Sequence, residues 1–115
     1  MQYSERFSDQ DLTQIVEQSL IYMCACPAQV AQALRTVREM HRYQLNCLTD
    51  ASNDPRVHQA IADTATFTHA QLEDCMEKIL VIEQWDRATL TMPPHLRKRQ
   101  MQELASDSKF FNLPK

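Results

Sequence analysis

The sequence predicts an all-α fold: an up-and-down helical bundle of three to four helices, with a long third helix and a short C-terminal helix. The chain of 115 residues has no glycine, and the tight turns of β-hairpins depend on glycine beside Asn or Asp. Apolar residues recur at three- and four-residue steps over long stretches, which is the helical period. We expect a single domain over residues 1–115, with tails at 1–7 and 107–115.

The first helix is predicted to begin at Ser8 and to end near Met23. Ser8 is a good N-cap residue, and Asp9 and Asp11 place carboxylates in the first turn, where they offset the positive helix end. The expected buried stripe is Leu12, Ile15, Val16, Ser19, Leu20 and Met23.

A second helix is predicted from about Pro27 to Leu48, after a tight connection at Cys24–Pro27. Its expected buried face is Val30, Leu34, Val37, Met40 or His41, Leu45 and Leu48. The cluster Thr49–Pro55 predicts a turn, in which Asp54 caps the next helix and Pro55 opens it.

The third helix is predicted from Pro55 to about Met92, with a kink or break as an alternative near Thr64–Thr68, where β-branched residues lower helix propensity. Its expected buried face is Val57, Ile61, Thr64, Thr68, Leu72, Cys75, Ile79 and Ile82. Pro93 and Pro94 end it, and a short helix follows around His95–Ala105. We also expect a polar layer within the apolar core, formed by Ser19, His41, Thr64 and Thr68.

Composition excludes several classes of function. Phosphate-binding loops and the strained turn of serine hydrolases need glycine, which excludes nucleotide-binding and serine-hydrolase functions. Because no other catalytic arrangement is visible either, we expect a non-enzymatic protein. The net charge of −3 opposes nucleic-acid binding, and Arg35, Arg38 and Arg42 are interleaved with acidic residues, as on a solvated face. With no signal-like segment and no apolar run long enough to span a membrane, a cytoplasmic location is expected.

The cysteines are the sharpest candidates for chemistry. An antiparallel hairpin about residues 51–54 would bring Cys75 to the bundle end that carries Cys24 and Cys26. Three thiolates there would suit a soft metal ion such as zinc or copper, or a redox pair with a resolving cysteine. That site is the alternative: we expect the cysteines to be structural and the protein to need no cofactor, because free cysteine commonly behaves as a small buried hydrophobe.

Two further signals for a metal are weaker. His69 and Glu73 have the one-turn spacing of a ligand pair, but such a pair is usually solvated, and the second motif of a di-iron site is missing. The segment Arg42–Thr49 resembles a stretch of the helical copper-sensing repressors. Gln44 stands where that family has a metal-binding cysteine, so the sequence is not assigned to it.

The C-terminal part of the third helix is apolar on every side, which predicts a contact between copies of the chain. Ile79–Ile82 and Trp85 would leave a large exposed patch on a monomer, and twofold pairing is the commonest solution for identical chains. The predicted interface is Ile79, Leu80, Ile82 and Trp85. The alternative is that the aromatic tail, with Phe110 and Phe111, folds back over Trp85.

Together these features predict an intracellular interaction or ligand-binding protein that acts as a homo-oligomer, most simply a homodimer. Another protein partner is possible, whereas nucleic acid and membrane are not expected. A metal- or thiol-dependent sensor or redox protein using Cys24, Cys26 and Cys75 is the competing hypothesis.

Overall fold

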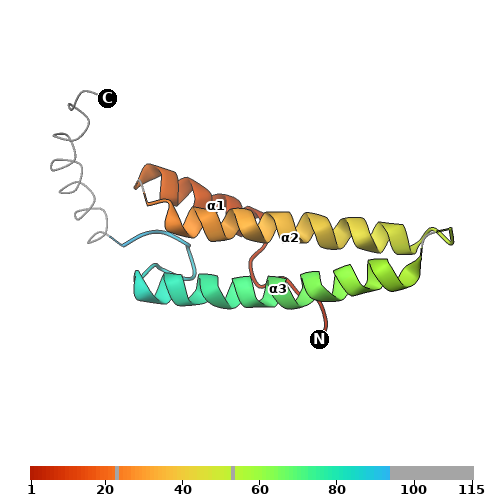
Figure 1. Cartoon of the computed structure of the whole chain (residues 1–115). Coiled ribbons are helices and arrows are strands. Elements are labelled where there is room, and N and C mark those ends of the chain that lie inside the picture. Colours follow the sequence, from red (N-terminus) through yellow and green to blue (C-terminus); the bar gives the residue numbers. More distant parts are fainter. Residues whose placement is uncertain (23, 53, 94–115) are drawn as a thin grey trace, which may run out of the picture.

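The computed structural model describes residues 1–22, 24–52 and 54–93, and within them the predicted all-α class is confirmed. The helices are α1 (Asp9–Ile21), α2 (Cys26–Leu48) and α3 (Pro55–Ile82). In Figure 1, α2 and α3 run side by side in opposite directions, and α1 packs on α2. No helix of the described part is long and apolar enough to cross a membrane. The helix expected at 95–105 and the tail at 107–115 lie outside the described residues.

Helix α1 begins as predicted. The Ser8 hydroxyl accepts a hydrogen bond from the Asp11 amide, and the Asp11 carboxylate accepts one from the Ser8 amide, both at 2.9 Å, so the two residues form a reciprocal capping box. Leu12 and Ile15 are buried, but the expectation for Leu20 is wrong, since it is exposed. A helix turns about 100° per residue, which carries Leu20 away from the buried side.

Helix α2 has the predicted extent, with Pro27 in its first turn. Leu34, Val37 and His41 are buried, whereas Leu45 is exposed and was wrongly placed in the core. The reason lies in α1, which begins beside Arg38 and Arg42, since both bond the Asp9 carboxylate. Beyond these arginines, none of the three described helices covers that side of α2.

Helix α3 begins as predicted and is continuous through 64–68, but the predicted end at Met92 is wrong. The helix ends at Ile82 in a Schellman arrangement, in which the Trp85 amide donates to the Leu80 carbonyl and the Gln84 amide to the Val81 carbonyl. Gln84 has a φ of 58°, in the left-handed region that glycine normally fills.

The predicted buried face of α3 is also wrong. The stripe beside it is buried instead, and consists of Ala62, Ala65, Thr66, His69, Glu73, Met76 and Leu80. Two alanines let α2 approach closely, and the buried polar members find partners within the chain, as described below. The expected stripe, from Val57 to Ile82, therefore lies on the flank of the hairpin rather than in its interior.

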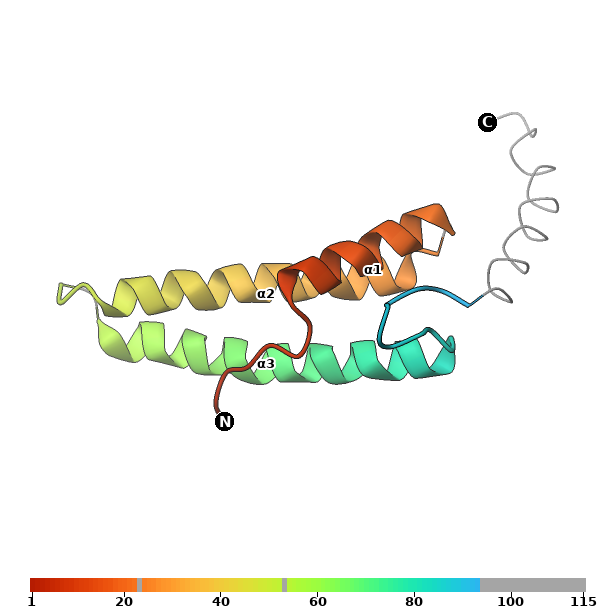
Figure 2. The same ribbon diagram turned by 180° about the vertical axis from the view of Figure 1, so that it is seen from behind.

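Two segments outside the helices complete the core on the side that α1 occupies. Residues 3–8, where a tail is predicted up to residue 7, cross α3, and Figure 2 shows them in front of it. Phe7 of this segment is fully buried. The loop after α3 returns to α1, where the Met92 amide donates to the Gln18 side chain at 3.0 Å, and it buries Trp85 and Leu90.

Candidate functional site

A buried charge network joins the N-terminal segment to α2 and α3. The Arg38 side chain is only 1% exposed, and each of its three guanidinium nitrogens donates a hydrogen bond. Nε donates to His69 Nε2 at 2.9 Å, one terminal nitrogen donates to Asp9 Oδ1 at 2.8 Å, and the other donates to the Phe7 carbonyl. Arg38 thus bonds α3, α1 and the N-terminal segment at once.

The Glu73 carboxylate is the buried counter-charge, with a side chain 1% exposed. One oxygen accepts the backbone amides of Arg6 at 2.7 Å and Phe7 at 3.0 Å, and the same oxygen lies 3.5 Å from the Arg38 guanidinium. Arg6 in turn bonds the Asp74 carboxylate at 2.6 Å, which raises the pKa of the Arg6 guanidinium above its usual range. Glu73 therefore compensates a buried cation and fixes the backbone of residues 6 and 7.

His69 is neutral in this arrangement. Because Arg38 Nε is always a donor, His69 Nε2 must accept and the ring proton lies on Nδ1, which is 3.6 Å from Glu73 Oε1. Burial lowers the pKa of His69 below its ordinary value, and the Arg38 charge adds to this against the opposing effect of Glu73.

An aromatic side chain covers the network. The Tyr3 ring stacks on His41 with centroids 4.0 Å apart and lies tilted over His69 at 4.9 Å, while its hydroxyl donates to Glu5 at 2.5 Å. Burial raises the pKa of the Tyr3 phenol above its usual range. Residues 3–9 are thus fastened by charge, hydrogen bonds and ring contacts.

The sequence interpretation missed this network. The pair His69 and Glu73 was expected to be solvated, and Arg38 to lie on a solvated face, yet all three are buried. The available signal was their spacing: Arg38 and His41 continue the stripe of Leu34 on α2. The expected polar layer is wrong in one member. Thr64 is exposed, and its hydroxyl donates to the Ala60 carbonyl within its own helix.

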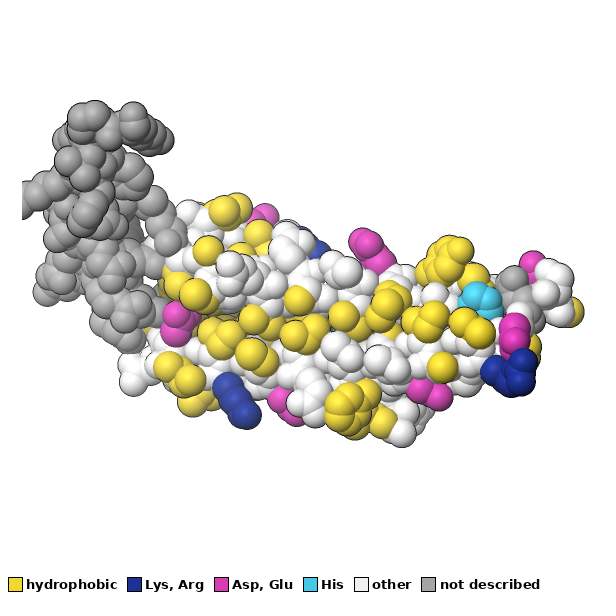
Figure 3. Space-filling view, viewed as in Figure 1, with side chains coloured by type: hydrophobic (Ala, Val, Ile, Leu, Met, Phe, Trp, Pro, Cys, Tyr) yellow, Lys and Arg dark blue, Asp and Glu magenta, His cyan; other side chains and the backbone are white. Residues whose placement is uncertain are grey.

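The second feature is the face of the α2–α3 hairpin that α1 and the N-terminal segment leave uncovered, here called the open face. Figure 3 shows a row of hydrophobic side chains along the seam between the two helices on this side. Helical spacing places on this side Cys26, Val30, Ala33, Met40 and Cys47 of α2, and Val57, Ile61, Thr64, Thr68, Leu72, Cys75, Ile79 and Ile82 of α3.

The row along the seam is uncharged, and the charged side chains of this face lie at its margins in Figure 3. Val57 is 54%, Met40 38% and Ile82 79% exposed, while Leu72 is half-buried against the core. A solvated helix face would mix charges of both signs. This face has instead the composition of the centre of an interface, where charged residues are depleted.

The size of the open face matches a specific protein contact. The 28 residues of α3 give a length of about 42 Å, and two helices of ~10 Å diameter give a width of ~20 Å. The product is about 800 Å² for this whole side of the hairpin, which is comparable to one partner's share of a standard interface.

The predicted interface residues divide between the core and the surface. Leu80 and Trp85 are 2% and 6% exposed and pack in the chain's own core. Ile79 is half-buried and Ile82 exposed, both on the open face, whereas Val81 is exposed on another side of α3. Only Ile79 and Ile82 of the predicted set are therefore placed where a second molecule could reach them.

Cys24, Cys26 and Cys75 do not form a metal site in the described part of the chain. No group of three His, Cys, Asp or Glu side chains within residues 1–22, 24–52 and 54–93 is placed to hold a metal ion. Cys26 and Cys75 are exposed, and the half-buried Cys24 thiol lies 3.6 Å from a Glu83 oxygen. Burial raises the pKa of the Cys24 thiol, with Glu83 adding to the effect, so the reactive thiolate is disfavoured.

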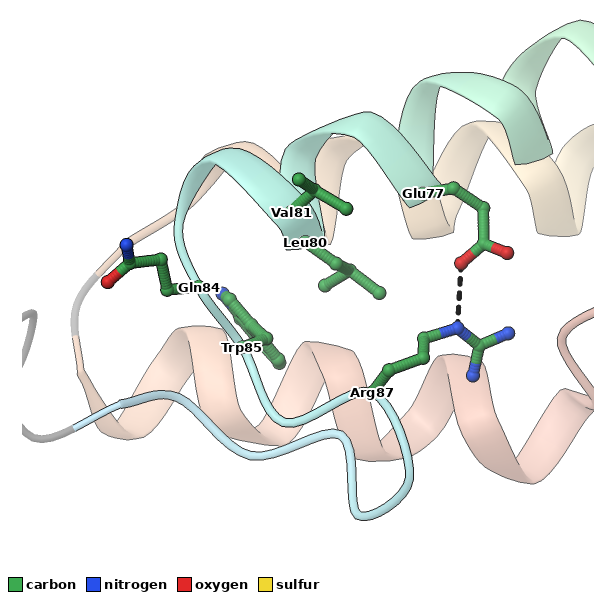
Figure 4. Close-up of a pocket in the computed structure, with 6 residues that line it drawn as sticks. All are labelled: Glu77, Leu80, Val81, Gln84, Trp85 and Arg87. Carbon is green, nitrogen blue, oxygen red and sulfur yellow. Dashed lines mark hydrogen bonds and ion pairs between the residues drawn. The ribbon is translucent and has the colours of Figure 1, made fainter.

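A half-open pocket of about 400 Å³ lies between the end of α3 and the following loop. Figure 4 shows Leu80, Val81 and Trp85 among its lining residues, with Glu77 and Arg87 opposite each other. These two charged groups bond each other at 2.7 Å. The charges of the pocket thus neutralise each other, and its remaining lining is largely apolar, so it suits an apolar group better than a charged substrate.

Comparison with known proteins supplies no family for this geometry. The chain matches no family model, no curated protein and no solved structure.

Proposed function

We propose that the protein is a non-enzymatic helical interaction module that acts as a homo-oligomer, with the open face as its contact surface. The observation that carries the proposal is a row of apolar side chains along the seam between both helices of the hairpin, with charged side chains only at its margins. Fully burying an exposed aliphatic side chain contributes ~1.5–3 kcal/mol, which offsets part of the cost of association.

A second copy of the chain is the partner that the face fits best. A partner of different sequence is commonly selected by complementary charges, and the row of side chains along the seam of the open face is uncharged. Two hairpins packed face to face would enclose four helices around one core, the arrangement of a four-helix bundle. The contact would repeat about a twofold axis, as in most homodimers.

We propose a cytoplasmic location and a helical bundle as the working form of the protein, with the second hairpin supplying the missing helices. The half-open pocket beside Trp85 is the place for a small apolar ligand, but its position off the open face makes ligand binding secondary to self-association.

The proposal is tested by charging the open face without disturbing the core. Met40 and Cys75 are exposed residues of this face, so Met40→Lys with Cys75→Lys should leave the monomer folded. Two cations without partners in a buried contact cost several kcal/mol each. We expect the dissociation constant of the dimer to rise by more than ~100-fold. Sedimentation velocity measures this change.

Val81→Lys is the matched control, because Val81 is 75% exposed and lies on another side of α3. This variant should associate like the unmodified chain. Substitutions at Leu80 or Trp85 would report on folding instead, since both are buried within one chain. Equal association of the charged variant and the control would refute the open face as the contact.

A further inference from the structure

We propose that His69 is the pH-sensing group of a latch that fastens residues 3–9 onto α2 and α3, and that this latch opens as the pH falls from neutral to mildly acidic. The inference is independent of the proposed function, because the latch lies on the side of the hairpin that α1 and the N-terminal segment cover (Figure 2).

The N-terminal segment depends on a few contacts with the two helices. Its backbone amides at Arg6 and Phe7 donate to Glu73, its Phe7 carbonyl accepts from Arg38, and the Asp9 carboxylate accepts from the same guanidinium. Arg38 therefore supplies one contact to residue 7 and one to residue 9, and its displacement weakens the attachment of both.

His69 sets the position of Arg38. Its Nε2 lone pair accepts the Arg38 Nε proton at 2.9 Å, and this nitrogen is also the one that must take up a proton when the ring becomes charged. A protonated ring would place an N–H group against the N–H of Arg38, and a positive charge against a guanidinium. Neither arrangement is stable at this distance, so protonation must displace Arg38.

The groups around His69 come from every element packed against it. Glu73 of α3 and Glu5 of the N-terminal segment favour the charged ring, whereas Arg38 and His41 of α2 oppose it. The other ionisable groups of the network are Tyr3, Arg6, Asp9, Arg42 and Asp74. Burial outweighs the carboxylates, and the pKa of His69 is lowered in the latched state.

The direction of the pH effect follows from linkage. A released His69 has an ordinary pKa of about 6.5, so at lower pH the open form binds more protons than the latched form and gains population. The latch is fully stabilised above about pH 6.5 and weakens as the pH falls below it. The α2–α3 contact beyond the network is apolar along much of its length, so the segment opens before the hairpin does.

The test is hydrogen exchange of the Arg6 and Phe7 amides in the full chain, followed by NMR. Both amides donate to Glu73 in the latched state. Between pH 7.5 and 5.0, after correction for intrinsic exchange, we expect their protection to fall by up to roughly 30-fold, the change set by a free pKa near 6.5. Unchanged protection would overturn the latch.

His69→Gln identifies the sensor, because a Gln oxygen can accept from Arg38 and does not titrate. This variant should keep its protection within about 3-fold over the same pH range. His58→Gln is the control, since His58 bonds Gln44 away from the segment, and it should respond like the unmodified chain. A pH response that persists in folded His69→Gln would assign the effect to another group and overturn the proposal.

The His69 ring of the unmodified chain gives a second readout that does not depend on how the variant folds. The pKa of His69 read from its ring proton shifts should lie below the ordinary value of about 6.5, because burial disfavours the charged ring in the latched state. A pKa of His69 at or above that value would overturn the proposal.

Discussion

Glu73→Gln separates the charge of the buried network from its hydrogen bonds. The Gln oxygen can still accept the Arg6 and Phe7 amides, but the Arg38 guanidinium, 1% exposed and 3.5 Å from the carboxylate, loses its buried counter-charge. Removing one partner of a buried ion pair costs ~3–5 kcal/mol. Because Asp9 still bonds Arg38, we expect a loss near the lower limit, about 3 kcal/mol.

Glu73→Ala extends the comparison. It removes the same charge and also leaves the buried Phe7 amide without its acceptor, which adds ~1–3 kcal/mol. Both free energies of unfolding are measurable in urea by far-UV circular dichroism and Trp85 fluorescence. A loss of 3 kcal/mol is a large share of the ~5–15 kcal/mol typical of a domain.

The control is Arg56→Gln, which breaks an exposed ion pair with Asp54 and should leave the unfolding midpoint unchanged. A loss below ~1 kcal/mol for Glu73→Gln would refute the assignment of a buried, functioning counter-charge. Equal losses for the Gln and Ala variants would refute the assigned role of the carboxylate as acceptor for residues 6 and 7.

Two local features lead to further predictions. Ser8→Ala removes the hydroxyl that accepts from the Asp11 amide, so unfolding in urea should show a loss of about 1 kcal/mol, and no loss would contradict the capping box. Gln84→Gly relieves a left-handed backbone at φ 58° and should stabilise the chain by up to ~1 kcal/mol. A destabilised Gln84→Gly variant would show that the side chain, rather than the backbone, matters at this helix end.

The helix starts were predictable because they depend on local chemistry. Ser8 with Asp11, and Asp54 with Pro55, carry their own capping groups in the sequence. The end of α3 was not predictable in the same way. It closes with Gln84 in the position where a helix usually has glycine, and a chain without glycine gives no such signal.

The buried face of α3 was missed for a different reason. Hydrophobic periodicity selects Val57, Ile61 and Leu72 over Ala62 and His69. Burial here is decided by partners distant in sequence: the amides of residues 6 and 7 and the Arg38 side chain make it favourable to bury Glu73. The stripe that periodicity selected, from Val57 to Ile82, lies on the open face. The sequence pattern therefore identified an apolar surface of α3, but it could not show whether this chain's own helices bury that surface.

The most direct test of the open face is a mixture of isotope-labelled and unlabelled chains, in which nuclear Overhauser effects are recorded only between copies. The account predicts intermolecular contacts from the methyl groups of Met40, Ile61, Leu72 and Ile79, and none from Val81. Intermolecular contacts confined to Val81 and its neighbours, or no intermolecular contact at all at tens of micromolar, would contradict it.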